Sequence, residues 1–284
     1  MLDRNTLWRQ GSILEFEHAH QLGLVTEESK NERIVVISHD CDIPSDKETI
    51  VEVIKGHVVT KSNSMYEGAK HQRTIHINYE VDGGASECIE LEIKNKYSID
   101  KELFSSIALN PNQSLSISLS EKRSLKQWLA ARYGRPAYPN AFESRLKKTQ
   151  RIGKKDRSLE WIIADKISPV SKYIVGIFFD LGEERNSELE TNEPYYLSIS
   201  IVYDIQKWGF DAKTKSEALS KEIKDFFHSV YGMPHEATEI ALEECQAISS
   251  QQMTLSDLMK VDQWRVEYIS INDDEPHIQS GSTP

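Results

Sequence analysis

The chain has 284 residues, of which 38% are hydrophobic and 28% charged, which is enough to bury a large core in one domain or two. Its formal net charge is −11, and its longest apolar runs are strand length, so no transmembrane helix is expected. Three widely spaced cysteines argue against a disulfide framework, and the first residues lack the apolar core of a signal peptide. A cytoplasmic protein is therefore expected.

Residues 1–119 carry the pattern of a β-rich part. Runs rich in Val and Ile predict strands over residues 34–38, 50–60, 74–80 and 87–94. Asp82, Gly83 and Gly84 stand between the last two runs and favour a hairpin turn. Residues 114–119 alternate between apolar and polar and predict a further strand. We expect a small twisted sheet or a partial barrel.

Residues 121–157 are the most strongly basic part of the chain, with twelve lysines or arginines against three acidic residues. This segment carries a net charge of +9 in a chain of net charge −11, so the rest carries −20. Such segregation is typical of a surface that binds a polyanion. Nucleic acid, with DNA as the first expectation, is the partner that this pattern favours, and no membrane partner is expected.

The spacing of apolar residues predicts two helices within this basic part, which we bound at residues 120–168. Leu125, Trp128 and Leu129 mark an amphipathic helix that ends near Gly134, and a second helix is expected over residues 141–152. A stiff loop with two prolines joins them.

Arginine side chains bind phosphates through planar guanidinium groups, and exposed aromatic rings stack on bases. The expected nucleic-acid contacts are Arg123, Lys126, Trp128, Arg132, Tyr133, Arg135, Tyr138, Arg145, Lys147, Lys148 and Arg151, with Phe142 as a further ring. The competing interpretation is that the lysines only form a solvated helix face.

Residues 169–271 predict a second sheet packed on helices. Strands are expected over residues 172–180 and 195–204 as an antiparallel pair, joined by an acidic connection that stays solvated, and over residues 264–271. Helices are expected over residues 214–231 and 236–248, and residues 272–284 read as a flexible tail. The complete prediction is an α+β fold with a β-rich N-terminal part, a central basic helical segment and a C-terminal antiparallel sheet packed on helices.

The most pointed local feature is the polar turn at residues 38–42, which directly follows a buried strand. Polar residues at the end of a strand are a common way to place reactive groups on a rigid scaffold. The candidate catalytic residues are Asp40, Asp42 and His39, because the two carboxylates share one face if the strand continues.

Four other interpretations of the 38–42 turn stay open. In one, the two aspartates hold a divalent ion together with His39 or with one of Glu52, Glu90 and Glu92. In another, His39, Cys41, Cys88 and one of His57, His71 and His76 bind zinc. Cys41 beside His39 can be an activated thiolate, and the polar residues can also serve only as a structural turn. No metal-binding or phosphate-binding motif is present, so neither a metal nor a cofactor is expected.

Three short stretches resemble uncharacterised bacterial proteins. They are W-x-Q-G-S-I-L at residues 8–14, S-x-x-C-D-I at residues 38–43 and R-Y-x-R-P-A-Y-P at residues 132–139. The resemblance implies a bacterial protein with a role in defence against phage, and it carries over no catalytic residue.

The first functional hypothesis is a DNA-acting hydrolase that removes bases. An N-glycosylase needs a carboxylate to stabilise the sugar cation and aromatic rings to hold a flipped base, and it needs no metal. In this hypothesis the basic segment is a clamp that presents DNA to the 38–42 turn. The alternatives are a metal-dependent nuclease, a non-enzymatic module that binds nucleic acid, and a protein-binding role for the acidic faces.

Overall fold

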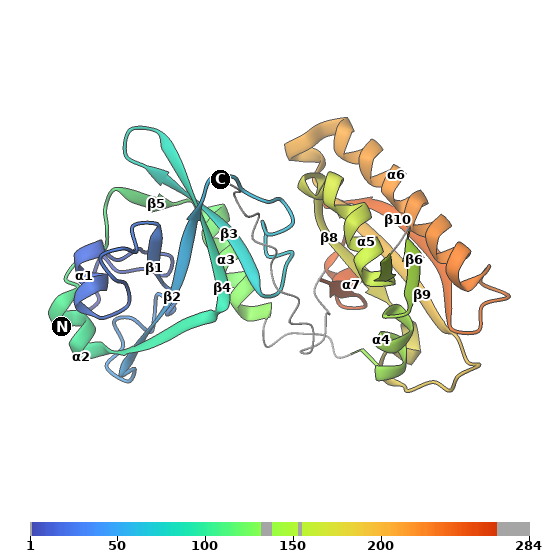
Figure 1. The fold of residues 1–284 in the computed structure, drawn as a ribbon, viewed down its shortest axis with the longest axis horizontal. Coiled ribbons are helices and arrows are strands. Elements are labelled where there is room, and N and C mark those ends of the chain that lie inside the picture. The colour runs from blue at the N-terminus through green and yellow to red at the C-terminus, as the bar shows by residue number, and fades with distance from the viewer. Residues whose placement is uncertain (1, 132–137, 153–154, 266–284) are drawn as a thin grey trace, which may run out of the picture.

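The computed structural model describes residues 2–131, 138–152 and 155–265. They form an N-terminal lobe, residues 2–131, and a C-terminal lobe, residues 138–265, each with its own sheet (Figure 1). The predicted α+β class is confirmed. Among the described residues, no helix is both long and apolar enough to cross a membrane.

Five antiparallel strands build the sheet of the N-terminal lobe, which is a half-barrel, as the sequence predicts. Across the sheet the order is β1 (Glu32–Val36), β2 (Ile50–Val59), β4 (Ala85–Asp100), β3 (Thr74–Val81) and β5 (Leu115–Ile117). The expected hairpin turn joins β3 to β4, where Gly83 and Gly84 have φ angles of 96° and 88°. Such angles favour glycine.

The half-barrel bends where β2 crosses β4. The register between these strands shifts after Ile54, and a Cβ atom on Gly56 would lie 2.4 Å from Leu91 Cδ2 and 2.7 Å from the carbonyl oxygen of Glu90. Only a residue without a side chain allows this approach of the two strands.

Both faces of this sheet are covered. One core includes Trp8, Ile34 and Phe104, beneath α1 (Phe16–Gln21) and α2 (Lys101–Ile107). The other core receives Leu125 and Trp128 from α3 (Leu119–Ala131). The first predicted helix of the basic segment is therefore confirmed, and it packs on the N-terminal lobe.

A mixed sheet forms the C-terminal lobe. Its order is β10 (Ile240–Ser249), β9 (Tyr195–Tyr203), β8 (Ile174–Asp180) and β11 (Asp262–Trp264). The predicted antiparallel pair of β8 and β9 is confirmed. Helix α6 (Ile205–Tyr231) covers the sheet with Leu219, Ile223 and Phe227, which confirms the predicted apolar stripe.

The helix predicted over residues 236–248 is wrong, because this stretch is strand β10. It pairs in parallel with β9, and α6 is the crossover between them (Figure 1). Ile240 and Leu242 enter the same core as the α6 stripe. Burial beside β9 outweighs the helix preference of the alanine and glutamate residues in this stretch.

The second predicted helix of the basic segment is wrong beyond residue 146. Helix α4 (Asn140–Leu146) is followed by a hairpin of β6 (Thr149–Ile152) and β7 (Lys155–Ser158). Helix α5 (Leu159–Ile167) comes next. The predicted strand over residues 264–271 is described only as far as residue 265, and the expected tail lies outside the described residues.

Three short helical elements complete the C-terminal lobe. They are η1 (Ser168–Tyr173), η2 (Gly182–Asn186) and α7 (Leu255–Leu258).

The loop between β2 and β3 joins the two lobes. Met65 packs on the core of the C-terminal lobe, Ser64 Oγ lies 2.5 Å from Ser171 Oγ, and Lys70 Nζ donates to the carbonyl oxygen of Ser171 over 2.8 Å. Burial lowers the pKa of Lys70 to about 8.

The two lobes divide the basic segment between them. Helix α3 packs on the N-terminal lobe, and α4 and the hairpin belong to the C-terminal lobe.

Candidate nucleic-acid interface

The 38–42 turn is a folded turn and not an extension of the strand. Strand β1 ends at Val36, and the N–H groups of Asp42 and Ile43 both donate to the carbonyl oxygen of His39. Ser38 is buried, and its Oγ accepts the N–H of Glu52 over 2.8 Å. The expected alternation, with both carboxylates on one face, therefore does not apply.

Asp40 is one half of an ion pair that ties the turn to α3. Its carboxylate accepts from Lys122 Nζ at 2.9 and 3.0 Å and from the N–H of Gln10 at 2.8 Å. Partial burial would raise the pKa of Asp40, but the bonds from Lys122 and Gln10 outweigh it and leave the pKa below its usual value. Asp40 thus stays ionised, and its negative charge is balanced by Lys122 within the fold.

The other residues of the turn face solvent. His39, Cys41 and Asp42 are exposed, and His39 Nδ1 accepts the N–H of Cys41 over 3.3 Å. Asp42 has no ion-pair partner among the described residues, which leaves it as the freer of the two candidate carboxylates.

The zinc interpretation drew on histidines of the β-rich part. Both ring nitrogens of His76 are engaged, one by Glu90 at 2.9 Å and the other by the N–H of Asn63 at 3.0 Å. Burial, with nearby glutamates, raises the pKa of the Cys88 thiol. Within the described ranges, no group of three or more His, Cys, Asp or Glu side chains is arranged to hold a metal ion.

Three of the rings expected to stack on bases are core residues. Trp128 and Phe142 are fully buried, and Tyr138 is 7% exposed. Phe142 packs against Phe179 and Tyr195 in the C-terminal lobe. None of these rings offers a face to a base, so the prediction that they stack on bases is wrong.

Arg145 was expected to bind phosphate, and it is instead a buried structural residue. Its guanidinium donates four hydrogen bonds of 2.7 to 3.2 Å to backbone carbonyl oxygens, and it lies 4.9 Å from the ring of Tyr195. The acceptors are the carbonyls of Leu189, Glu190, Glu193 and Glu239. Four of the five N–H donors of the guanidinium are therefore used within the fold.

The acidic connection, expected to stay solvated, is thereby fixed to α4. Glu188 also accepts the N–H groups of Asn140 and Ala141 at 2.7 and 2.9 Å, and these bonds lower its pKa. Arg145 of the basic segment and Glu188 of the acidic connection therefore each bind the backbone of the other segment.

The remaining basic candidates differ in how far their charge is engaged. Lys147 pairs with Glu143 at 3.0 Å, and Lys148 pairs with Glu239. Arg123, Lys126 and Arg151 make no ion pair within the described ranges. Arg132, Tyr133 and Arg135 lie outside the described residues.

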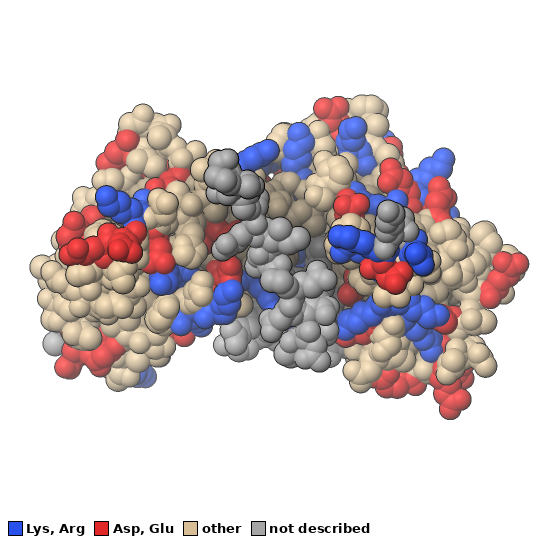
Figure 2. Space-filling view, viewed as in Figure 1, with Lys and Arg blue, Asp and Glu red and all other residues tan. Residues whose placement is uncertain are grey.

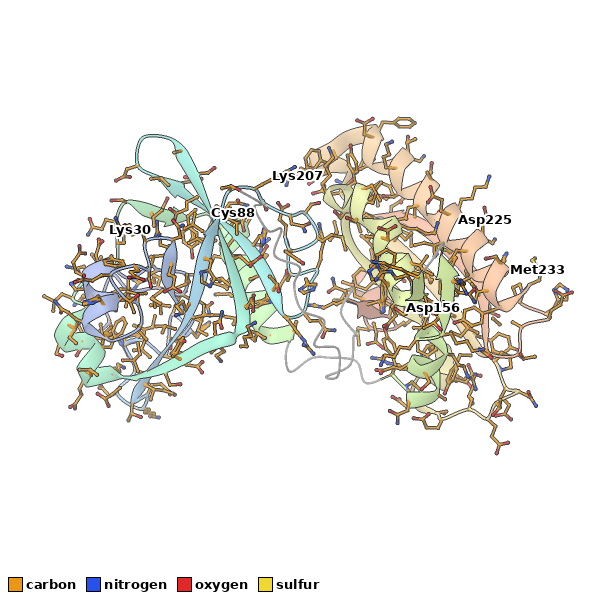
Figure 3. All side chains as sticks on the ribbon, in the orientation of Figure 1. Lys30, Cys88, Asp156, Lys207, Asp225 and Met233 are labelled. Atoms are coloured by element: carbon orange, nitrogen blue, oxygen red, sulfur yellow. The ribbon has the colours of Figure 1, made fainter. Side chains whose placement is uncertain are left out.

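The β6–β7 hairpin presents the most open basic surface of the C-terminal lobe. The register pairs Gln150 with Arg157 and Arg151 with Asp156, so Arg157 and Lys155 share one face of the hairpin. Asp156 is its only acidic residue among those described. Lysine and arginine side chains surround this region on the face shown in Figure 2, and Asp156 is labelled in Figure 3.

Trp161 completes this surface, and the sequence analysis missed it. Ser158 caps helix α5, its Oγ accepting the N–H of Trp161 over 3.2 Å, which places Trp161 in the first turn of the helix. Trp161 is 38% exposed, and the guanidinium of Arg157 lies 4.2 Å from its ring centroid. An arginine on an exposed ring, with Lys155 on the same face of the hairpin, can bind phosphate and stack on a base.

Glu160, the residue before Trp161, is buried in the C-terminal lobe. It is 3% exposed and accepts no hydrogen bond from the described residues. Burial raises its pKa to about 7, with Lys147 opposing and Glu143 adding to the shift. At neutral pH this carboxyl is therefore partly protonated.

Comparison with protein-family models, curated proteins and solved structures returned no match. The function is therefore argued from the chain's own residues.

Proposed function

We propose that this protein binds nucleic acid through the β6–β7 hairpin and the first turn of α5, and that unpaired nucleotides are its preferred ligand. The observation that carries the proposal is the exposed stack of Arg157 on Trp161, with Lys155 on the same face of the hairpin. Stacking on an aromatic ring requires a base that is free of its duplex neighbours. The phosphates of the same strand would bind the free cations.

The proposal assigns no reaction to the bound strand. Base removal was expected to use a carboxylate of the 38–42 turn, but Asp40 is held by Lys122. The turn also lies on the N-terminal lobe, whereas the hairpin lies on the C-terminal lobe (Figure 1). Within the described part of the basic segment, only α3 adjoins the turn, so Lys122 is the one described contact that supports the clamp hypothesis.

Fluorescence anisotropy with labelled single-stranded DNA, single-stranded RNA and duplex DNA tests the binding. At about 50 mM salt we expect single strands to bind tighter than duplex, with affinity falling steeply towards about 200 mM. The double change Lys155→Glu and Arg157→Glu should weaken binding by about tenfold or more.

The matched control is the double change Lys215→Glu and Lys221→Glu, which alters the net charge equally at exposed positions on α6. If both double variants weaken binding alike, binding is a general attraction between the cations of the protein and the phosphates, and the hairpin is not the site. Binding of duplex as tight as of single strands would contradict the preference for unpaired nucleotides.

The absence of a reaction is tested on the same DNA. Strand breaks that appear only after alkali treatment would show base removal, and loss of those breaks in Asp42→Asn would return the 38–42 turn to the role of active site. We expect no such breaks.

A further inference from the structure

A cavity of about 470 Å³ opens on the N-terminal lobe, far along the chain from the hairpin. It lies between α1, β1, the end of the β3–β4 hairpin and the start of β5. Lys30, at its rim, is labelled in Figure 3 beside these elements. The volume lies within the range of pockets that hold small organic molecules.

The floor of the cavity is apolar. Leu14, Ala19, Val25 and Ile34 belong to the buried core beneath α1, and the ring of Phe16 packs against the same core. A ligand that covered these side chains would remove apolar surface from water. The ligand should therefore carry an apolar body.

The rim is charged, and its charge is unbalanced. Four carboxylates, Glu15, Glu27, Glu32 and Glu87, line the cavity together with two cations, Lys30 and Arg33, and Glu32 also pairs with Lys55 outside the lining at 3.4 Å, which leaves a surplus of one carboxylate. Acidic side chains gather on this part of the N-terminal lobe in Figure 2. A surplus of carboxylates around an apolar floor favours a cation over an anion.

The one arginine of the rim is not available to a ligand. Arg33 donates two bonds of 2.8 Å to the carboxylate of Glu87 and two more to the carbonyl oxygens of Lys30 and Glu32. These bonds join β1 to β4 across the intervening strand β2 and hold the rim in place. They also engage the guanidinium of Arg33, which is the group that would best bind a carboxylate or phosphate.

Acceptors remain free on the opposite side of the rim. Glu15 is positioned by Asn112, whose Nδ2 donates to Oε2 over 2.9 Å, and its Oε1 accepts nothing from the described residues. Glu27 is exposed and has no ion-pair partner within the described ranges. Phe16 adds an aromatic face on which a cation can rest.

We propose that this cavity binds a small organic cation, a protonated amine attached to an apolar ring. The amine would donate to Glu15 and Glu27, and the ring would cover Leu14, Phe16 and Val25. This site is independent of the hairpin and would give the protein a second, small-molecule ligand.

Isothermal titration calorimetry with the full chain tests the proposal with three matched probes. Phenethylamine, 2-phenylethanol and phenylacetate share the ring and differ in charge. We expect the amine to bind at least about tenfold tighter than either analogue. Equal binding of all three, preference for phenylacetate, or no binding of any probe up to millimolar concentration would overturn the proposal.

Two variants locate the binding. The change of Glu15→Gln together with Glu27→Gln removes two charges and keeps the side-chain shape, and it should weaken amine binding by about tenfold or more. Ser114→Trp places a large side chain at the rim and should abolish it. The control, Glu17→Gln together with Glu28→Gln, changes exposed neighbours outside the cavity and should leave binding unchanged.

Folding of each variant is checked by its binding of single-stranded DNA, which uses the other lobe, and by circular dichroism. Amine binding that survives Ser114→Trp in a folded protein would place the amine elsewhere and refute the assignment.

Discussion

Arg145 and Arg157 belong to the same basic segment, and each lies against an aromatic ring, yet they have opposite roles. Arg145 is buried against Tyr195 with four carbonyl acceptors, whereas Arg157 lies on the exposed face of Trp161. The difference is made by their surroundings. The acidic connection packs on α4 and supplies three of the four acceptors, while no such loop of the described residues covers the hairpin.

The comparison teaches that the excess of positive charge in this segment has two causes. One part balances carboxylates and carbonyls within the fold, through Lys122, Arg145, Lys147 and Lys148. The other part, on the hairpin, has no ion-pair partner among the described residues, and the same is true of Arg123 and Lys126 on α3. Cations without such partners can bind an external polyanion without a loss of structure.

Replacement of Arg145 should produce the largest effect. Arg145→Ala removes four hydrogen bonds to backbone carbonyl oxygens and leaves those of Leu189 and Glu193 without a donor among the described residues, and we expect it to lower the free energy of unfolding by about 3 kcal/mol. Urea denaturation followed by circular dichroism measures the change. Arg157→Ala is the matched control and should change stability by no more than about 0.5 kcal/mol. Equal effects of the two substitutions would show that Arg145 and Arg157 do not differ in their contribution to stability.

Glu160 provides a second contrast with Arg145, because its carboxyl is buried without a hydrogen-bond donor among the described residues. Its carboxyl releases a proton near pH 4.5 when unfolded and near pH 7 when folded, so the folded state binds more protons between these values. Stability contributed by this group therefore falls as pH rises from about 4.5 to about 7. Glu160→Gln should remove that fall.

The expected gain in Glu160→Gln is about 2 kcal/mol near pH 8, after allowance for the favourable place of a carboxylate in the first turn of α5. It should shrink towards zero near pH 4.5. Thermal melts of both proteins across this range measure the difference. Glu243→Gln, at an exposed position on β10, should show no such trend. A constant difference at every pH would mean that Glu160 is ionised throughout.

Much of the fold follows from local sequence pattern, and the exceptions have a physical cause. The strands of the half-barrel, the hairpin turn at Gly83 and Gly84 and the stripe of α6 were all predicted, because each depends on residues close in the chain. Strand β10 was missed because its pairing partner β9 lies across the whole length of α6. Its residues alone do not distinguish a helix from a buried strand.

The candidate site divides in the same way. The basic segment was visible as charge, but Trp128, Phe142 and Arg145 were assigned to its surface, and burial is decided by contacts with distant elements. Trp161 lay just beyond the segment. The available signal was Ser158, which as a helix cap places Trp161 in the first turn of a helix next to the basic segment.

Trp161 should carry the next largest effect, on binding and not on stability. Trp161→Ala removes the stacking surface, and we expect affinity for single-stranded DNA to fall by about 1 to 3 kcal/mol. Anisotropy titrations measure this loss, and urea denaturation checks the fold. Phe210→Ala, which removes a ring that is 75% exposed on α6, is the control and should leave affinity unchanged. An unchanged affinity in Trp161→Ala would reduce the hairpin to a purely electrostatic site.

The smallest effect is expected at the 38–42 turn. Asp40→Asn removes the charge that balances Lys122, and because the pair is partly exposed we expect a loss of about 1 kcal/mol or less in the free energy of unfolding. The pKa of Asp40 is lowered in the folded state, so the wild-type contribution is present at neutral pH and is lost as pH falls through that value. Urea denaturation at neutral and acidic pH measures the difference between the two proteins. Binding of single-stranded DNA should stay unchanged, since Asp40 anchors α3 and the contact with nucleic acid is assigned to the other lobe. A large loss of binding with little change in stability would show that the two parts of the basic segment act together on one ligand.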